Sequence, residues 1–188
     1  MELLAKDGTV LAIHVIRAGL VKLVYMTAEG KAMICGIHTA GSVIGAAEAV
    51  LGQPSPTAAI TVVPTSTSRL CVAEFRRLVT EDLAFSAAVL QAVSRDAHEA
   101  TREAITLGSY PAQVRLQRLL SQLASNSSPV RKVGRLRLSL PVKQYELAEL
   151  LAVTPAYLCR LLGRLEREGK IKREKGWILL PQPARAPL

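Results

Sequence analysis

The chain has 188 residues, which is enough for one large domain or for two modest ones that each bury a core. Hydrophobic residues make up 49% of it, but no uncharged apolar run reaches the roughly 18 to 20 residues that span a bilayer, and no leader with a cleavage site is recognisable. We therefore expect a cytoplasmic protein with no membrane partner. The three cysteines are far apart and lack CxxC spacing, so neither a disulfide framework nor a metal site is predicted: Cys35, Cys71 and Cys159.

The net charge of +9 is unevenly distributed along the chain. Residues 1–110 carry 9 Lys and Arg against 10 Asp and Glu, whereas residues 111–188 carry 15 against 5. The two halves therefore have charges of −1 and +10. This asymmetry favours a module that binds a polyanion joined to an electrically neutral module, although a solvated basic face is the alternative if charge is considered alone.

The first segment, residues 1–79, has the pattern of short strands separated by turns. Strand-like residues occur at 15–16, 20–25, 32–37, 59–63 and 68–72, and the breaks between them are rich in Gly and Pro. This pattern predicts an antiparallel barrel or sandwich. Strand-like residues begin almost at Met1, so we expect part of this domain to be absent or rebuilt.

Residues 80–108 are predicted to form one long helix. No Gly or Pro occurs between Thr80 and Leu107, and Asp82 supplies negative charge near the start. Alternating steps of three and four residues trace a heptad seam, which predicts a helix that pairs with a second copy of the chain. A helix packed into its own domain is the alternative. The predicted dimer contacts are Leu83, Leu90, Val93, Ala97, Ala100, Ala104 and Leu107, with Ser86 completing the seam.

The third segment, residues 109–188, contains a helix–turn–helix pattern. A helix is expected over residues 112–124, and a period of two at residues 135–140 predicts a half-buried strand. Two apolar runs of helical period then flank Val153-Thr154-Pro155, where Thr154 can cap the second helix and Pro155 suits its first position. Gly169 ends that helix, and the strands at residues 170–175 and 177–180 form a hairpin that is interpreted as a wing.

The second helix is the predicted recognition helix, because it carries arginines and follows a short turn. Side chains in its first turns are best placed to reach base edges, and Arg160 can bond both acceptors of a guanine. The residues predicted to read bases are Arg160, Tyr157, Ala156 and Pro155. Those predicted to meet phosphates are Lys143, Thr154, Arg164, Arg167, Lys170, Lys172, Arg173 and Lys175.

Residues 147–171 resemble the helix-turn-helix of the CRP/FNR superfamily, the cyclic-AMP receptor protein and its relatives. The motif is Leu147-Ala148-x-x-Leu151-x-Val153-Thr154-Pro155-x-x-Leu158-x-Arg160-Leu161-Leu162-x-x-Leu165-x-x-x-Gly169-x-Ile171. Upstream, the stretches at Gly19 and at Gly41 to Gly45 are similar to the glycine motifs of the family's β-roll. The resemblance implies an α+β chain: an N-terminal antiparallel β-roll of the cyclic-nucleotide-binding type, a dimerisation helix and a C-terminal winged helix-turn-helix.

The resemblance also implies a transcription regulator that binds a two-fold symmetric site on double-stranded DNA as a homodimer, with RNA polymerase as a further partner. Members that bind cyclic nucleotides use a Glu for the ribose and an Arg-Ser pair for the phosphate, and this chain has Ala46, Pro56 and Thr57 at those places. A phosphate cradle without its cation does not favour cyclic AMP. We therefore expect no cofactor of the usual kind and an unknown effector.

Three alternatives remain at this stage. A regulator with a non-standard ligand pocket could still bind a cyclic nucleotide or another small molecule. The basic half could instead bind RNA or a protein, although its few aromatics are scattered over different elements. An enzyme is disfavoured, because the three histidines are dispersed and no nucleophile elbow or phosphate-binding loop occurs.

Overall fold

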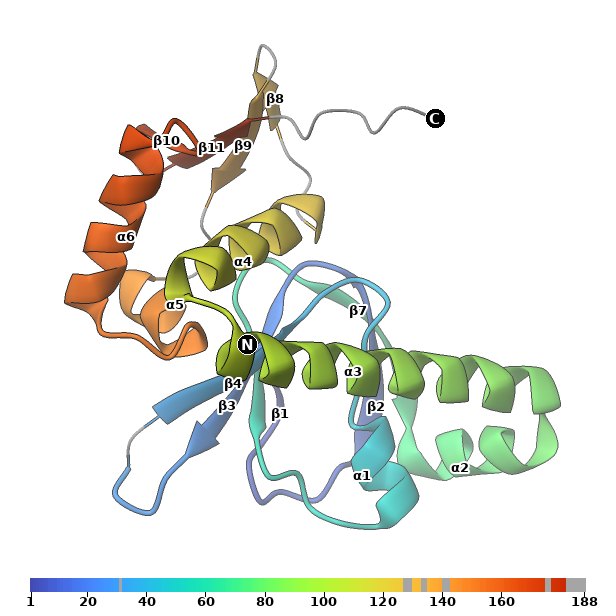
Figure 1. Cartoon of the computed structure of the whole chain (residues 1–188). Coiled ribbons are helices and arrows are strands. Elements are labelled where there is room, and N and C mark those ends of the chain that lie inside the picture. Colours follow the sequence, from blue (N-terminus) through green and yellow to red (C-terminus); the bar gives the residue numbers. More distant parts are fainter. Residues whose placement is uncertain (31, 127–129, 133–134, 140–142, 175–176, 182–188) are drawn as a thin grey trace. The chain divides into compact units, whose positions relative to one another are not determined.

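The computed structural model describes residues 1–30, 32–126, 130–132, 135–139, 143–174 and 177–181 (Figure 1). The chain divides into two compact units, Met1–Ala104 and Ile105–Leu188. The division falls within one long helix, α3 (Leu83–Ser109). None of the described helices is long and apolar enough to cross a membrane.

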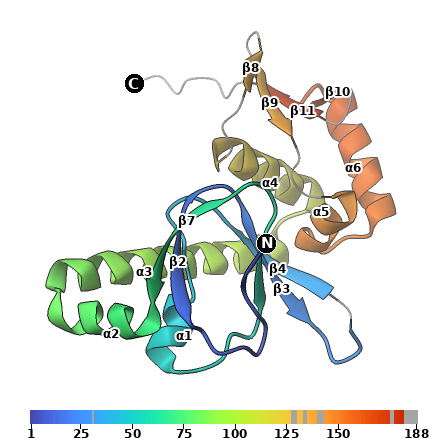
Figure 2. The ribbon, with the colours of Figure 1, turned by 180° about the vertical axis from the view of Figure 1, so that it is seen from behind.

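Two antiparallel sheets form the N-terminal unit. Short β-branched and apolar runs supply the strands, because such side chains pack well on a pleated, half-buried surface. The first sheet has the order β1 (Glu2–Leu4), β6 (Ala58–Thr61), β3 (Val21–Met26) and β4 (Ala32–His38), and the second has β5 (Val43–Ile44), β2 (Ala12–Ala18) and β7 (Ser66–Cys71). Figure 2 shows the second sheet, in which β2 and β7 lie side by side.

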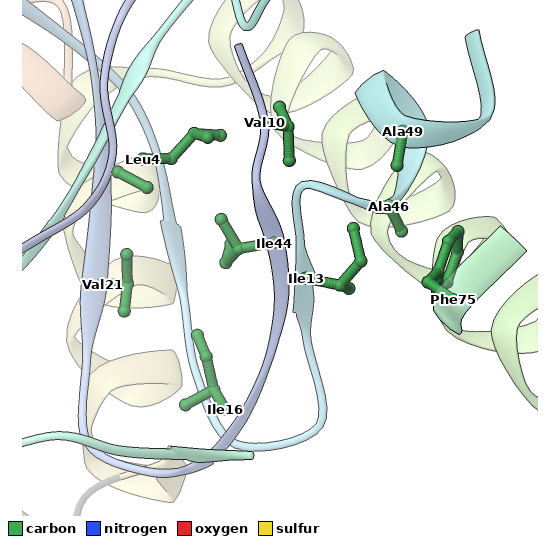
Figure 3. Close-up of a cluster of buried hydrophobic side chains, with 10 residues drawn as sticks. Leu4, Val10, Ile13, Ile16, Val21, Ile44, Ala46, Ala49 and Phe75 are labelled. Carbon is green, nitrogen blue, oxygen red and sulfur yellow. The ribbon is translucent and has the colours of Figure 1, made fainter. Parts of the chain in front are cut away.

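The hydrophobic core of this unit lies between the two sheets and extends to the helices (Figure 3). Ile13 and Ile16 from β2, Val21 from β3 and Ile44 from β5 are almost fully buried. Phe75 completes the core from the helix that follows β7, and its ring lies edge-on to that of Phe85 in the first turn of α3, 6.0 Å between centroids. The start of α3 is therefore packed onto the β-roll by its own chain.

Two glycines of the predicted β-roll motifs are required by the backbone. Gly19 has φ of 109°, and a Cβ there would lie 2.4 to 2.8 Å from atoms of Thr65. Gly45 has φ of 87°, and a Cβ would lie 3.2 Å from the carbonyl oxygen of Ala12. Any other residue would be strained at both places.

Two short helices of the N-terminal unit were missed by the sequence analysis. They are α1 (Ala46–Leu51) and α2 (Val72–Glu81). Val72, Phe75 and Val79 have helical spacing, which is the signal that could have revealed α2, but the stretch is short and starts directly at the end of a strand. The predicted start of the long helix at Thr80 is also wrong, because Thr80 belongs to α2 and the long helix begins at Leu83.

Helix α3 begins at Leu83 because Asp82 caps it. The backbone N–H of Phe85 donates to Asp82 Oδ1 at 2.9 Å, which satisfies one of the free donors of the first turn. Asp82 itself is extended, with φ of −116° and ψ of 104°. The acidic residue predicted near the start of the helix therefore lies just before its first turn.

In the described part of the C-terminal unit, three helices follow the last turn of α3 and combine with a four-stranded antiparallel sheet of order β10-β11-β9-β8. The helices are α4 (Ala112–Asn126), α5 (Gln144–Leu150) and α6 (Pro155–Arg167), and the strands are β8 (Val130–Lys132), β9 (Arg135–Ser139), β10 (Lys172–Glu174) and β11 (Trp177–Pro181). The hairpin of β10 and β11 is the predicted wing. The predicted fold class, an N-terminal antiparallel roll followed by a long helix and a winged helix-turn-helix, is confirmed.

Candidate nucleic-acid interface

Helix α6 has one face buried in its own unit and one face exposed. Leu158, Leu161, Leu162 and Leu165 are almost completely buried, at the spacing of one helical face. The opposite face carries Ala156, Cys159, Arg160, Arg164 and Arg167, all exposed. The leucines fix the helix to its unit and leave the cations available to an outside partner.

Helix α6 begins where the sequence predicts, with Thr154 as its cap and Pro155 as its first residue. Thr154 has extended backbone angles, and its hydroxyl accepts a hydrogen bond from the N–H of Tyr157 at 3.3 Å. Pro155 occupies the first turn, where the missing N–H costs nothing. The prediction of Thr154 as the cap is therefore confirmed, while a phosphate contact from Thr154 stays a prediction.

The turn between α5 and α6 has an alanine in the left-handed region. Ala152 has φ of 49°. Its N–H donates to the carbonyl of Glu149 at 2.9 Å, and the N–H of Val153 donates to that of Ala148 at 3.0 Å. These two bonds form a Schellman ending of α5, a position that usually takes glycine. The turn therefore stores strain of about 1 kcal/mol that a glycine would avoid.

The four residues predicted to read bases share the exposed first turns of α6. Pro155, Ala156, Tyr157 and Arg160 are all exposed. The Arg160 guanidinium carbon lies 5.4 Å from the centroid of the Tyr157 ring, a distance at which a cation is attracted to the ring face. Arg160 is thus supported from one side by Tyr157 and makes no ion pair among the described residues.

Three of the cations predicted to meet phosphates are paired with carboxylates of their own unit. Arg173 donates from its N–H and from Nε to Glu166, at 2.9 and 2.8 Å. These bonds hold the pKa of Glu166 below its ordinary value. Lys170 lies 2.8 Å from Glu168 and Lys172 lies 2.7 Å from Glu174. The pairs are exposed, so each is weak in water and open to exchange for a phosphate.

The other predicted phosphate contacts are distributed around α6. Arg164 donates to Gln113 Oε1 at 3.4 Å, and Arg167 donates to the carbonyl of Gly163 at 3.4 Å. Lys143 precedes α5, with its ammonium 5.7 Å from the ring centroid of Tyr145. Lys175 lies outside the described residues.

Two exposed residues at the start of α5 were missed by the sequence analysis. Gln144 accepts a hydrogen bond from the thiol of Cys159 at 3.7 Å, and Tyr145 is about half exposed. This contact places Gln144 beside the exposed face of α6. No sequence signal marks it, because the contact joins residues 15 positions apart. Among the residues that the structure describes, no three His, Cys, Asp or Glu are grouped so that they could hold a metal ion.

Residues 114–185 match the family model of the Crp-like helix-turn-helix domain. The C-terminal unit carries a Crp-like helix-turn-helix domain. The match includes α5, α6 and the wing, the elements that form the exposed cationic surface. A search of curated proteins gives no match to this sequence.

Solved structures show that the fold of the whole chain is that of CRP/FNR regulators. FixK2 from Bradyrhizobium japonicum is 17% identical, with a TM-score of 0.81, and the match covers 97% of this chain and 88% of that one. A CRP-family regulator from Thermus thermophilus is 18% identical, with a TM-score of 0.82 and coverage of 97% and 89%. A CRP/FNR-family regulator from the same organism is 22% identical, with a TM-score of 0.75 and coverage of 96% and 87%.

The domain match and the common fold together confirm the predicted resemblance to the CRP/FNR superfamily. The chain is a DNA-binding transcription regulator. The geometry of α6 agrees with this role, because the helix offers an exposed cationic face on a rigid apolar base.

Proposed function

We propose that the chain binds a two-fold symmetric operator as a homodimer that pairs through α3. The observation that carries the proposal is the apolar surface of α3, which has 27 residues and none that is buried. Leu83 and Leu90 are 87% and 69% exposed, and Leu107 is 43% exposed. Large apolar side chains in a row on one helix usually mark a surface that another chain covers.

The residues between these leucines suit close pairing of two helices. Ala97, Ala100 and Ala104 are small, and the last of them lies one heptad beyond the first, so the backbones of two α3 helices can approach closely. Val93 differs from the rest of the predicted seam, because it packs against the core of the β-roll and is only partly exposed. Ser86 also turns inward, and its hydroxyl donates to the carbonyl of Val79. The proposed dimer contact therefore consists of Leu83, Leu90, Ala97, Ala100, Ala104 and Leu107.

In the proposed complex, each copy of α6 lies in a major groove. Arg160 reads a base, and Tyr157, Ala156 and Pro155 line the same contact. The phosphate contacts are assigned to Lys143, Thr154, Arg164, Arg167, Lys170, Lys172, Arg173 and Lys175. Their support is that the described members are all exposed, with Arg164 and Arg167 on α6 and Thr154 at its N-cap.

The dimer is tested by Leu90→Glu, with Leu51→Glu as the matched control. Leu51 ends α1 and is 67% exposed, close to the 69% of Leu90, but it is not part of the seam. A charge at Leu90 should give monomers in sedimentation experiments and at least about a tenfold loss of operator affinity, while Leu51→Glu leaves both unchanged. A Leu90→Glu protein that sediments as a dimer would contradict the proposal.

We propose further that cyclic AMP is not the effector. Ala46 is 1% exposed and is part of the core, and Pro56 is exposed in the loop before β6. The buried hydroxyl of Ser55 is bonded to Glu48 Oε1 at 3.3 Å and to the carbonyl of Thr57 at 2.8 Å. These residues offer no cation to a phosphate.

Isothermal titration of the full chain with cyclic AMP checks the effector proposal. No heat of binding is expected at micromolar nucleotide. Saturable binding at such concentrations would show that the loop holds the nucleotide by contacts other than the usual arginine, and would contradict the proposal.

A further inference from the structure

Arg115, in the first turn of α4, joins the ends of two other helices. One terminal nitrogen, Nη1, donates to the carbonyl of Leu107 at 3.2 Å and to that of Tyr110 at 3.0 Å. The other, Nη2, donates to the carbonyl of Leu151 at 2.7 Å. All four residues belong to the C-terminal unit. A single side chain thus connects the last turn of α3, the start of α4 and the end of α5.

The three acceptors are carbonyls that a helix cannot satisfy by itself. Leu107 lies in the last turn of α3, and Tyr110 directly follows that helix. Leu151 is the C-cap of α5. Carbonyls at helix C-termini lack partners within the helix and carry partial negative charge, which a guanidinium neutralises. The planar fork of arginine can donate in several fixed directions, whereas the ammonium of lysine acts as a compact point charge.

The contact between Arg115 and the carbonyl of Leu151 bears on DNA binding because Leu151 lies next to the turn before α6. The next residue is Ala152, whose φ of 49° makes the turn between α5 and α6. Arg115 therefore holds the carbonyl that directly precedes this strained turn. Its Nε is buried and has no hydrogen-bond partner among the described residues, so the fork is kept in place at the cost of one unsatisfied donor.

A second arginine of α4 holds the same end of α3. Arg118 lies one turn further along, with its guanidinium carbon 4.0 Å from the ring centroid of Tyr110. Its Nη1 also donates to Thr106 Oγ1 at 3.3 Å. The last turn of α3 is thus fixed to α4 from two sides, and Arg115 continues the connection to the helix-turn-helix.

We propose that Arg115 is a positioning residue that sets the orientation of the helix-turn-helix relative to the last turn of α3, and so the spacing of the two half-sites that the dimer accepts. The inference rests on the proposed homodimer. In such a dimer the two copies of α3 pair about the two-fold axis, and the pose of each α6 against the last turn of α3, which lies in the same unit, affects how far apart the two major-groove contacts lie. Residues that touch DNA determine which half-site sequence is bound, whereas Arg115 determines the distance between the two half-sites.

The test measures spacing preference in the full chain. Wild-type protein first selects its preferred duplex from a random pool. Binding is then measured to that duplex, to derivatives with one base pair added or removed between the half-sites, and to a duplex with a single half-site. Wild type should prefer the selected spacing by about tenfold or more. Arg115→Met should reduce this preference to about threefold or less while half-site affinity stays within about twofold of wild type.

Two further variants separate the role of the Arg115 fork from general effects of charge and folding. Arg77→Met removes the same charge from an exposed site on α2 and should behave as wild type. Arg115→Lys keeps the charge but loses the planar fork, so it should lose the spacing preference as Arg115→Met does. If Arg115→Met shows no cooperative thermal transition, Arg115→Lys takes its place in the measurement.

Several outcomes would overturn the inference. They are an unchanged spacing preference in Arg115→Met, a wild-type preference in Arg115→Lys, and an equal loss of affinity for every duplex, half-site included. A selected pool without an inverted repeat would instead show that the proposed two-fold binding is wrong, and the inference would fall with it.

Discussion

Helices α3 and α6 are both amphipathic, but they differ in what covers their apolar residues. In α6 the leucines are buried by the helix's own unit, and Leu161 is only 2% exposed. In α3 the leucines stay uncovered, and Leu90 is 69% exposed. A helix whose apolar face is already satisfied offers its polar face to a partner, here DNA, whereas a helix with an uncovered apolar face requires a second protein surface. The two helices therefore differ in role: α6 is the candidate DNA contact, and α3 is the surface proposed to pair two chains.

The largest expected effect is on the free energy of unfolding, when one leucine of each helix is replaced by alanine. Leu161→Ala leaves a cavity in the C-terminal unit and should lower the free energy of unfolding by about 2 to 5 kcal/mol. Leu90→Ala should cost little at low protein concentration, where the chain is monomeric, and more as the concentration rises, because a dimer contact stabilises by mass action. Urea denaturation at several protein concentrations measures the free energy of unfolding of both variants. If the loss of free energy of unfolding in Leu90→Ala does not depend on protein concentration, Leu90 is not covered by a second chain.

A smaller effect is expected at the exposed face of α6. Arg160→Ala should reduce affinity for the preferred duplex by about 1 to 3 kcal/mol and relax preference at one base pair. Arg77→Met is the control, since it removes the same charge from an exposed site on α2 and should retain both the affinity and the base preference. Binding to a panel of single-base variants of the duplex measures the effect. An equal loss on all sequences would assign Arg160 to a phosphate instead.

The smallest effect concerns the turn that joins α5 to α6. Ala152→Gly should raise the free energy of unfolding by about 0.5 to 1 kcal/mol, because glycine adopts a positive φ without steric cost. The same change at Ala87, a helical position of α3, should instead lower it by about 0.5 to 1 kcal/mol. Thermal or urea unfolding of the two variants provides the measurement. If Ala152→Gly destabilises as Ala87→Gly does, the turn is not strained.

The DNA-binding half was largely predictable because its signals are local. The spacing of Leu158, Leu161 and Leu165 predicts the buried face, and Thr154 with Pro155 predicts where α6 begins. Each of these signals lies within a few residues of the feature that it specifies. Even the cost of alanine at position 152 could be anticipated, since the turn type of the motif sets the backbone there.

The β-roll half was predicted less completely because its elements depend on distant partners. The runs that form β2, β3, β4, β6 and β7 were recognised from composition, but β1 and β5 have only three and two residues and exist through pairing with β6 and β2. Helix α2 was missed for a related reason. Phe75 is buried by residues from the strands and from α3, and the helical spacing of Val72, Phe75 and Val79 does not indicate which distant residues cover it.

The recognition helix, the residue at which it begins and the long helix with an apolar seam before it could all be predicted from the order of residues along the chain. Periodicity and capping are local, so they can be recognised along the chain. Two features became visible only in the folded chain: Val93 packs on the β-roll and is not free for pairing, and Arg115 spans three backbone carbonyls. The physical reason is that these contacts involve faces and backbone atoms brought together by folding, and backbone carbonyls are the same at every position of a sequence.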